Sequence, residues 1–243
     1  MPRYHQRHVN LILLTPEDFS GTGRVLLTGR RREHVDEVHR ATVGDGLIVG
    51  LLNGRIGTGR IVRLDAESME MEVSLERDPP PPLPLTLLLA LPRPKVLSRI
   101  LFTASVMGVK RIHLINSWRV EKSFWDSPRL DRHAVRTQLM LGLEQAGDTM
   151  LPEVRIERRF RPFVEDELPA LATGTRALVA HPAAIDPCPL GTEGEVTLAI
   201  GPEGGFISGE ITMFQANGFQ AVTLGNRILT VEAAIPALLG RLF

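Results

Sequence analysis

Three short stretches in the second half of the chain have residue types that suit a ligand bound against the backbone. They are HP at 181–182, IGPEGGF at 200–206 and LGNRIL at 224–229. Each follows an apolar run that is typical of a buried strand. Because glycine lets a ligand lie directly on the main chain, three such loops side by side would offer N–H and C=O groups to an adenosine-bearing ligand. Any one of the loops alone is better explained as an ordinary turn, and it is the three together that favour a ligand.

Other common ligand motifs are incomplete in this sequence. The stretches GTG at 21–23 and 57–59 are only fragments of the dinucleotide fingerprint, and no phosphate-binding G-x-x-x-x-G-K-[ST] pattern occurs. The histidine pairs His5/His8 and His34/His39 lack the carboxylate or cysteine partners of a metal centre. We therefore expect neither a dinucleotide, nor a triphosphate, nor a metal.

Composition limits the partners of the chain. It has 243 residues, with 28 basic and 28 acidic side chains, so contact with nucleic acid must come from a local patch. One cysteine, Cys188, excludes an internal disulfide and favours a reducing, cytoplasmic location. The first ten residues are polar, and no segment has the run of roughly 20 apolar residues that crosses a bilayer, so we expect no membrane partner.

Arginine-rich stretches favour an RNA partner. They are GRRREH at 29–34, which contains Arg30 and Arg31, GVKR at 108–111 and RIERRFR at 155–161. The planar guanidinium group can donate two hydrogen bonds to a phosphate. The aromatic content of 5% argues against a stacking platform for free single strands, and a folded RNA recognised by its shape would fit better. The alternative is that each run is a solvated surface.

Hydrophobic periodicity divides the chain into two domains. Short alternating strands with Gly-rich turns, interrupted by a helical stretch at 32–41, predict a small β-barrel over residues 1–77. The prolines of DPPPPLP predict a linker at 78–84. Residues 85–243 alternate strand and helix, which predicts a largely parallel sheet with helices on both faces. In such sheets ligands bind beyond the carboxyl ends of the strands, where GPEGG would lie.

This order of elements, followed by LVAHP, AIGPEGGF and LGNRIL before a terminal helix, resembles the RsmE family of SPOUT methyltransferases over nearly the full length. The resemblance implies a trefoil-knotted α/β domain, a PUA-like barrel that holds RNA, and a homodimer. It also implies S-adenosylmethionine (SAM) as cofactor and methylation of uridine N3 in small-subunit (16S) ribosomal RNA.

The resemblance also assigns residues to roles. Positions that match the cofactor loops are His181, Pro182, Ile200, Gly201, Pro202, Glu203, Gly204, Gly205, Leu224, Gly225, Ile228 and Leu229. Positions expected near RNA or the active site are Arg40, Lys95, Arg119, Glu144 and Gln145. With Arg30 and Arg31, the first three form the predicted RNA-binding set.

Two positions depart from the family pattern. Thr230 stands where L-R-T-E has its arginine, and Asp148 stands where E-Q-S/C-G-R has its arginine. Both changes remove positive charge from the expected site. The open alternatives are therefore a methyltransferase that acts on another rRNA or tRNA base, and a binding protein that has lost the reaction.

A methyl transfer needs little more than positioning of donor and acceptor. Since uridine N3 must lose its proton, a cation near the developing oxyanion would help. We predict that Arg227 supplies this cation, and that Glu232 or Glu144 orients the base or accepts its proton. The alternative is that Arg227 braces a loop and Glu232 forms a cap or salt bridge of the terminal helix.

Overall fold

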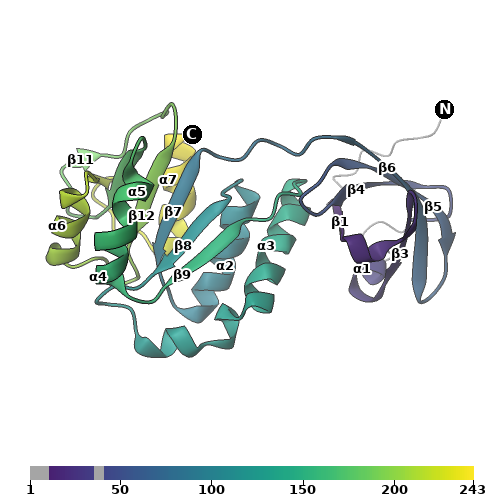
Figure 1. Ribbon diagram of the computed structural model, residues 1–243, viewed down its shortest axis with the longest axis horizontal. Coiled ribbons are helices and arrows are strands. Elements are labelled where there is room, and N and C mark those ends of the chain that lie inside the picture. Colours follow the sequence, from purple (N-terminus) through teal and green to yellow (C-terminus); the bar gives the residue numbers. More distant parts are fainter. Residues whose placement is uncertain (1–10, 36–40) are drawn as a thin grey trace. The chain divides into compact units, whose positions relative to one another are not determined.

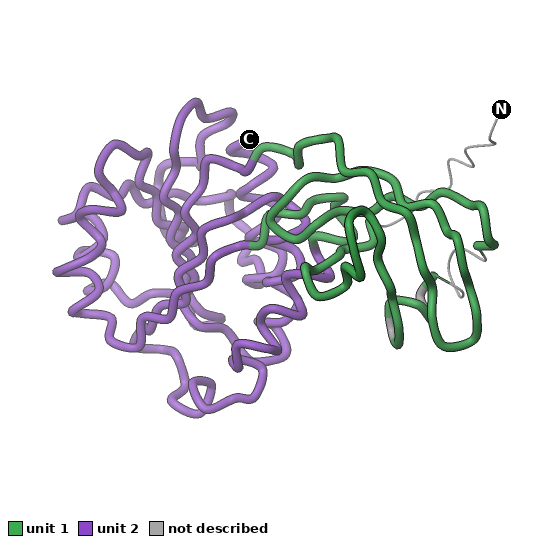
Figure 2. Tube along the Cα trace, turned by 45° about the vertical axis from the view of Figure 1, so that its right-hand side comes forward, with its two compact units in different colours: residues 1–81, 143–151 green, residues 82–142, 152–243 purple. Residues whose placement is uncertain are grey.

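The computed structural model describes residues 11–35 and 41–243. The chain forms two compact units, residues 1–81 with 143–151, and residues 82–142 with 152–243 (Figure 2). The stretch 78–84, predicted as a linker, is divided between the two units at Pro81 and Pro82. Residues 143–151, which we expected in the second domain, pack with the first unit.

The first unit is a six-stranded sheet in the order β1-β4-β5-β6-β3-β2, in which β1 and β4 are parallel and the other pairs antiparallel (Figure 1). Its strands are β1 (Ile12–Leu14), β2 (Phe19–Gly21), β3 (Arg24–Thr28), β4 (Gly46–Leu51), β5 (Ile56–Leu64) and β6 (Ser68–Arg77). The short elements η1 (Pro16–Asp18) and α1 (Gly29–His34) lie between them in sequence. The small β unit agrees with the predicted barrel.

Alternation along β6 explains how this sheet obtains a core. Met69 and Met71 are fully buried. Glu70 and Glu72, on the opposite side of the strand, both form salt bridges with Arg24 of β3. The predicted helix at 32–41 begins earlier, at Gly29. Residues 36–40 of that prediction lie outside the described residues.

The second unit is a seven-stranded sheet in the order β11-β13-β10-β12-β7-β8-β9, and all its paired strands are parallel. The strands are β7 (Leu85–Ala90), β8 (Arg111–Ile115), β9 (Glu153–Glu157), β10 (Arg176–Ala180), β11 (Asp186–Pro187), β12 (Val196–Ile200) and β13 (Gln220–Thr223). Every residue of β7 and β12 is buried, as expected for central strands covered on both faces. The predicted α/β class is confirmed.

Two groups of helices cover this sheet (Figure 1). The first group is α2 (Pro94–Val106), α3 (Arg132–Ala146) and α7 (Val231–Leu242), and the second is α4 (Phe160–Pro162), η5 (Phe163–Glu167), α5 (Leu168–Ala172) and α6 (Ser208–Ala216). In the first, Ser105 of α2 donates to the carbonyl of Leu139 in α3 at 2.8 Å. In the second, the rings of Phe160 and Phe214 meet edge to face. The 3-10 turns η3 (Lys122–Asp126) and η4 (Pro128–Leu130) precede α3.

Parallel pairing places the carboxyl ends of all these strands at one edge of the sheet. The segments that follow β7, β8, β10, β12 and β13 therefore lie along the same edge. This arrangement brings together residues more than a hundred positions apart in the chain. Arg93 after β7, for example, donates its backbone N–H to the Glu203 carboxylate after β12 at 3.0 Å.

Candidate functional site

A cavity of about 530 Å³ lies at this edge of the second unit. Its walls are the segments after β10, β12 and β13, the first turns of α7, and Arg119 from the segment after β8. Among the lining residues are His181, Pro182, Ile200, Gly201, Pro202, Glu203, Gly204, Gly205, Leu224, Ile228 and Leu229. Of the residues predicted from the cofactor loops, Gly225 is not part of the lining. The three loops do form one wall, as their strand ends suggested.

The loop after β12 is folded back on itself, which explains its first glycine. The N–H of Gly205 donates to the carbonyl of Pro202 at 2.7 Å, closing a turn. A Cβ on Gly201 would lie 2.9 Å from the backbone nitrogen of Phe206, closer than real Cβ atoms approach. Glycine at 201 is therefore required by the turn itself, whether or not a ligand is bound.

Gly204 is explained by Arg119. A Cβ on Gly204 would lie 2.9 Å from Cδ of Arg119, and Nη1 of Arg119 donates to the carbonyl of Gly204. The stem of Arg119 thus packs on the bare backbone of the glycine loop. Arg119, which we predicted to bind RNA, is placed in the wall of the cavity.

Glu210 holds the segment of Arg119 in place. This carboxylate is 5% exposed, and its Oε1 accepts the N–H of Trp118 at 2.7 Å, while Oε2 accepts the N–H of Ile207 at 2.9 Å. One buried side chain thereby joins the end of β8 to the start of α6. No local sequence pattern indicates this role of Glu210, because its partner at position 118 is brought near only by the fold.

Of the three predicted catalytic residues, only Arg227 lines the cavity. Its side chain is exposed and has no hydrogen-bond or ion-pair partner within the described part of the chain. Glu232 is paired with Arg99 of α2, Oε1 to Nε at 2.8 Å, and is not a lining residue. Glu144 belongs to residues 143–151 of the first unit and is not a lining residue either. Arg227 is thus the candidate that lies at the cavity, and its catalytic role stays a prediction.

The two departures from the family pattern have local structural roles. Thr230 is the N-cap of α7, where its Oγ1 accepts the N–H of Ala233 at 3.4 Å. Asp148 is 3% exposed and accepts the N–H of Met150 at 2.9 Å within the first unit. Each residue that stands in place of a family arginine therefore forms a local hydrogen bond of its own.

The remaining predicted RNA contacts are scattered. Arg31 forms two bonds of 2.5 Å to the Asp18 carboxylate and donates to the carbonyl of Leu13, so its guanidinium group braces the first unit. Lys95 is exposed in the first turn of α2, at the same sheet edge as the cavity. Arg30 lies in α1, and Arg40 lies outside the described residues. The contact of these residues with RNA stays a prediction.

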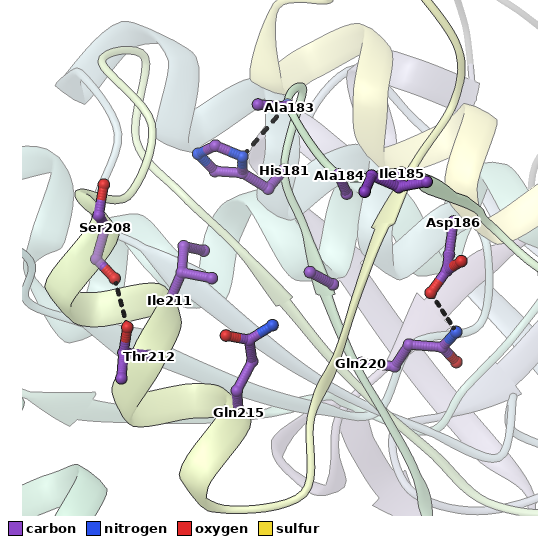
Figure 3. Close-up of a pocket in the computed structure, with 11 residues that line it drawn as sticks. His181, Ala183, Ala184, Ile185, Asp186, Ser208, Ile211, Thr212, Gln215 and Gln220 are labelled. Atoms are coloured by element: carbon purple, nitrogen blue, oxygen red, sulfur yellow. Dashed lines mark hydrogen bonds between the residues drawn. The ribbon is translucent and has the colours of Figure 1, made fainter.

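A second cavity, of about 500 Å³, shares His181 and Ala183 with the first (Figure 3). Several of its polar groups are already bonded to each other or to the backbone. Nδ1 of His181 accepts the N–H of Ala183 at 3.2 Å, and Gln220 donates to Asp186 at 3.0 Å (Figure 3). The first bond leaves Nε2 as the protonated nitrogen of a neutral His181.

One buried histidine lies away from both cavities. His113 of β8 is 5% exposed, its Nδ1 has no hydrogen-bond partner among the residues that the structure describes, and Oε1 of Glu157 is 3.7 Å away. Burial, with a smaller contribution from Arg155, lowers the pKa of His113 to about 4. Burial also raises the pKa of Glu157. His113 is therefore neutral at physiological pH and packs against Phe163 as part of the core.

Neither a metal centre nor a membrane-spanning helix is found in the described part of the chain. No group of three or more His, Cys, Asp or Glu side chains in residues 11–35 and 41–243 is arranged to hold a metal ion. Over the same residues, no helix combines the length and the apolar character that a membrane span requires.

The chain is similar to known RNA-modifying proteins. Residues 79–242 match the model of the RNA methyltransferase domain family. The chain is 32% identical over 232 residues to the ribosomal RNA small subunit methyltransferase E of Treponema pallidum (strain Nichols), covering 93% of this chain and 87% of that one.

Solved structures show the same fold. Ribosomal RNA small subunit methyltransferase E of Neisseria gonorrhoeae, bound to SAM, is 22% identical with a TM-score of 0.70, over 94% of this chain and 95% of that one. A Legionella pneumophila protein solved with bound SAM is 23% identical with a TM-score of 0.69, over 95% and 96%.

Proposed function

Because the chain belongs to the RsmE family of RNA methyltransferases, with a SPOUT-type α/β domain and a PUA-like β unit, we propose that it methylates N3 of a uridine in small-subunit (16S) ribosomal RNA, using SAM. The observation that carries this proposal is the single cavity in which the loops after β10, β12 and β13 meet Arg227. We further propose that it works as a homodimer in the cytoplasm.

The cavity fits SAM in size and chemistry. Its volume of about 530 Å³ lies within the usual range for small-molecule sites. The apolar side chains of Leu224, Val231 and Leu238 suit the faces of an adenine ring, and the backbone of residues 201–205 offers polar groups for its edges. When bound, SAM supplies an electrophilic methyl group that is already activated by its sulfonium, so no protein nucleophile is needed.

The work of the protein is then to position the acceptor and stabilise its charge. Loss of the N3 proton spreads negative charge onto the uracil oxygens. Arg227 is permanently charged and unpaired within the described residues, so it can donate to such an oxygen without breaking an existing bond. For proton transfer, Glu232 and Glu144 remain candidates. Release of Glu232 would require the loss of its bond to Arg99.

One observation favours a second candidate function. Thr230, which lines the cavity, is an uncharged N-cap residue at a position where the family pattern has an arginine. A site with fewer cations would suit an acceptor that carries less developing charge, and thus a different rRNA or tRNA base.

The test is transfer of labelled methyl from SAM to purified small ribosomal subunits and to bulk tRNA, followed by nucleoside mass spectrometry. We expect 3-methyluridine in the small-subunit RNA. Label in another nucleoside would establish the second candidate function. SAM binding without label in either RNA would refute both, and would indicate a binding protein that has lost the reaction.

A further inference from the structure

The two tryptophans of the chain have opposite environments. Trp125 is 8% exposed, its Nε1 donates to Oδ1 of Asn116 at 3.3 Å, and the guanidinium of Arg158 lies 5.5 Å from its ring centre. Trp118 is 79% exposed. An indole that is mostly in water does not contribute the stabilising free energy that burial of this large side chain usually provides. A partner outside the chain could bury this exposed indole.

The backbone beneath Trp118 is held firmly. Its own N–H donates to the buried Glu210 carboxylate at 2.7 Å. The preceding N–H, of Ser117, donates to Asn116 Oδ1 at 3.0 Å, and the N–H of Val120 closes a turn onto the carbonyl of Ser117 at 3.1 Å. The indole is thus presented from a fixed turn, which lowers the entropy lost when a partner binds.

The place of this turn in the fold indicates which kind of partner the indole would bind. Trp118 lies at the carboxyl edge of the sheet, directly before Arg119, which lines the proposed cofactor cavity. The segment after β7 runs beside it, since Leu91 donates its N–H to the carbonyl of Ile115, and this segment leads to the exposed Lys95. Lys122 is exposed on the other side of Trp118 in sequence. An exposed indole on a sheet edge that also carries exposed lysines suits an unpaired base between phosphates.

We propose that Trp118 stacks on an unpaired nucleobase of the RNA, a neighbour of the base that enters the cavity. This inference rests on the proposed function, because it assumes that the cavity holds the methyl donor. The low aromatic content therefore does not exclude stacking of a base at a single position. The chain lacks a platform of several rings, yet one rigid indole beside the reaction site is enough to hold one base.

The test uses the exposed indole as its own probe, in the full-length protein. A single-stranded uridine-containing RNA is titrated while tryptophan fluorescence is recorded, with a duplex of the same length for comparison. We expect the single strand to quench the wild-type signal more strongly than the duplex. In Trp118→Phe only the buried Trp125 emits, and the RNA-dependent quenching should disappear.

Activity separates stacking from a structural role. With small ribosomal subunits as substrate, Trp118→Ala should raise KM about tenfold or more, Trp118→Phe should raise it less, and kcat and SAM affinity should change little. Lys122→Ala is the matched control. It should reduce the salt dependence of RNA binding and retain the quenching.

Three results would overturn the inference. An unchanged KM in Trp118→Ala would show that the indole does not touch the RNA, and the proposed function would stand. Equal quenching of wild type and Trp118→Phe would place the RNA elsewhere. A change in sedimentation from dimer to monomer in Trp118→Ala, with unchanged RNA affinity, would assign Trp118 to an interface between two copies. The proposed function itself is tested separately, by measuring methyl transfer with the wild-type protein.

Discussion

At the scale of single residues, Arg227 is the side chain on which the proposed reaction depends most. It lines the cavity and is unpaired within the described residues. We expect Arg227→Ala to lower kcat by about a hundredfold, because a lost donor to a developing oxyanion costs this much in other enzymes. Affinity for SAM should change little. The measurement is single-turnover methyl transfer together with SAM titration.

The matched control for Arg227 is Arg176→Ala. Arg176 is also an exposed arginine, but it is the first residue of β10 and so lies at the opposite edge of the same sheet. This variant should retain wild-type turnover. If Arg227→Ala and Arg176→Ala were equally active, the electrostatic role of Arg227 would be excluded, and its part in bracing the loop would remain.

At the scale of elements, Thr230 determines how α7 begins. Its hydroxyl satisfies the N–H of Ala233, one of the donors that a helix leaves unpaired in its first turn. We expect Thr230→Ala to lower the free energy of unfolding by about 1 kcal/mol, and Thr230→Ser to restore it. Urea denaturation of the two variants checks this. Equal stability of both would show that the cap at 3.4 Å contributes nothing.

His113 makes the parallel sheet sensitive to acid. Its pKa in the folded chain, about 4, lies below the 6.5 of an unfolded histidine, so the unfolded state binds the extra proton between these values. The contribution of His113 to stability is complete above pH 6.5 and is lost as the pH falls toward 4. Between pH 7.5 and 5.5 the loss should be about 1 kcal/mol.

The variant that isolates this effect is His113→Leu, which removes both the titrating group and the unpaired Nδ1. Unfolding free energies of wild type and variant are measured at pH 7.5 and 5.5, so that the other titrating groups cancel in the comparison. The wild type should lose more stability than the variant. An identical loss in both would show that His113 takes no part in the pH dependence.

At the scale of the whole molecule, the chain enters the second unit and then returns to complete the first. Thr149 donates its hydroxyl to the carbonyl of Gly54 at 2.5 Å, and its own carbonyl accepts the N–H of Asn53 at 2.8 Å. Residues 143–151 are thus part of the first unit, although more than sixty positions separate them from its last strand. The first unit is incomplete without a segment of the later chain.

Gly50 tests this dependence. A Cβ at Gly50 would lie 2.4 Å from Cγ2 of the fully buried Thr149, whereas no atom of the described residues lies within 4 Å of a Cβ at Gly46 in the same strand. We expect Gly50→Ala to destabilise the protein by about 1–3 kcal/mol through this clash. Gly46→Ala should leave the stability unchanged or slightly higher. Thermal unfolding of both variants measures this difference in stability. Equal melting temperatures would contradict the packing of Thr149 on β4.

Most of the elements, and the family, can be predicted from the amino-acid sequence alone. Apolar runs, the proline stretch and the motifs at 181–182, 200–206 and 224–229 are local features, and local sterics and periodicity are enough to interpret them. Since parallel strands end at one edge, the three loops could be expected at that edge, and to meet there if their strands were neighbours. The sheet order β13-β10-β12 meets that condition. Almost all the predicted cofactor residues do line one cavity.

Contacts between side chains that are distant in the sequence could not be predicted in this way and are known from the fold. Four such contacts join distant positions. They are the salt bridge of Glu232 with Arg99, the packing of Arg119 on Gly204, the hydrogen bond from Trp118 to Glu210, and the packing of residues 143–151 with the first unit. No local pattern encodes such a contact, because it depends on where the packed elements place each side chain. For the same reason the sequence showed three candidate catalytic residues, and the fold brought one of them, Arg227, to the cavity.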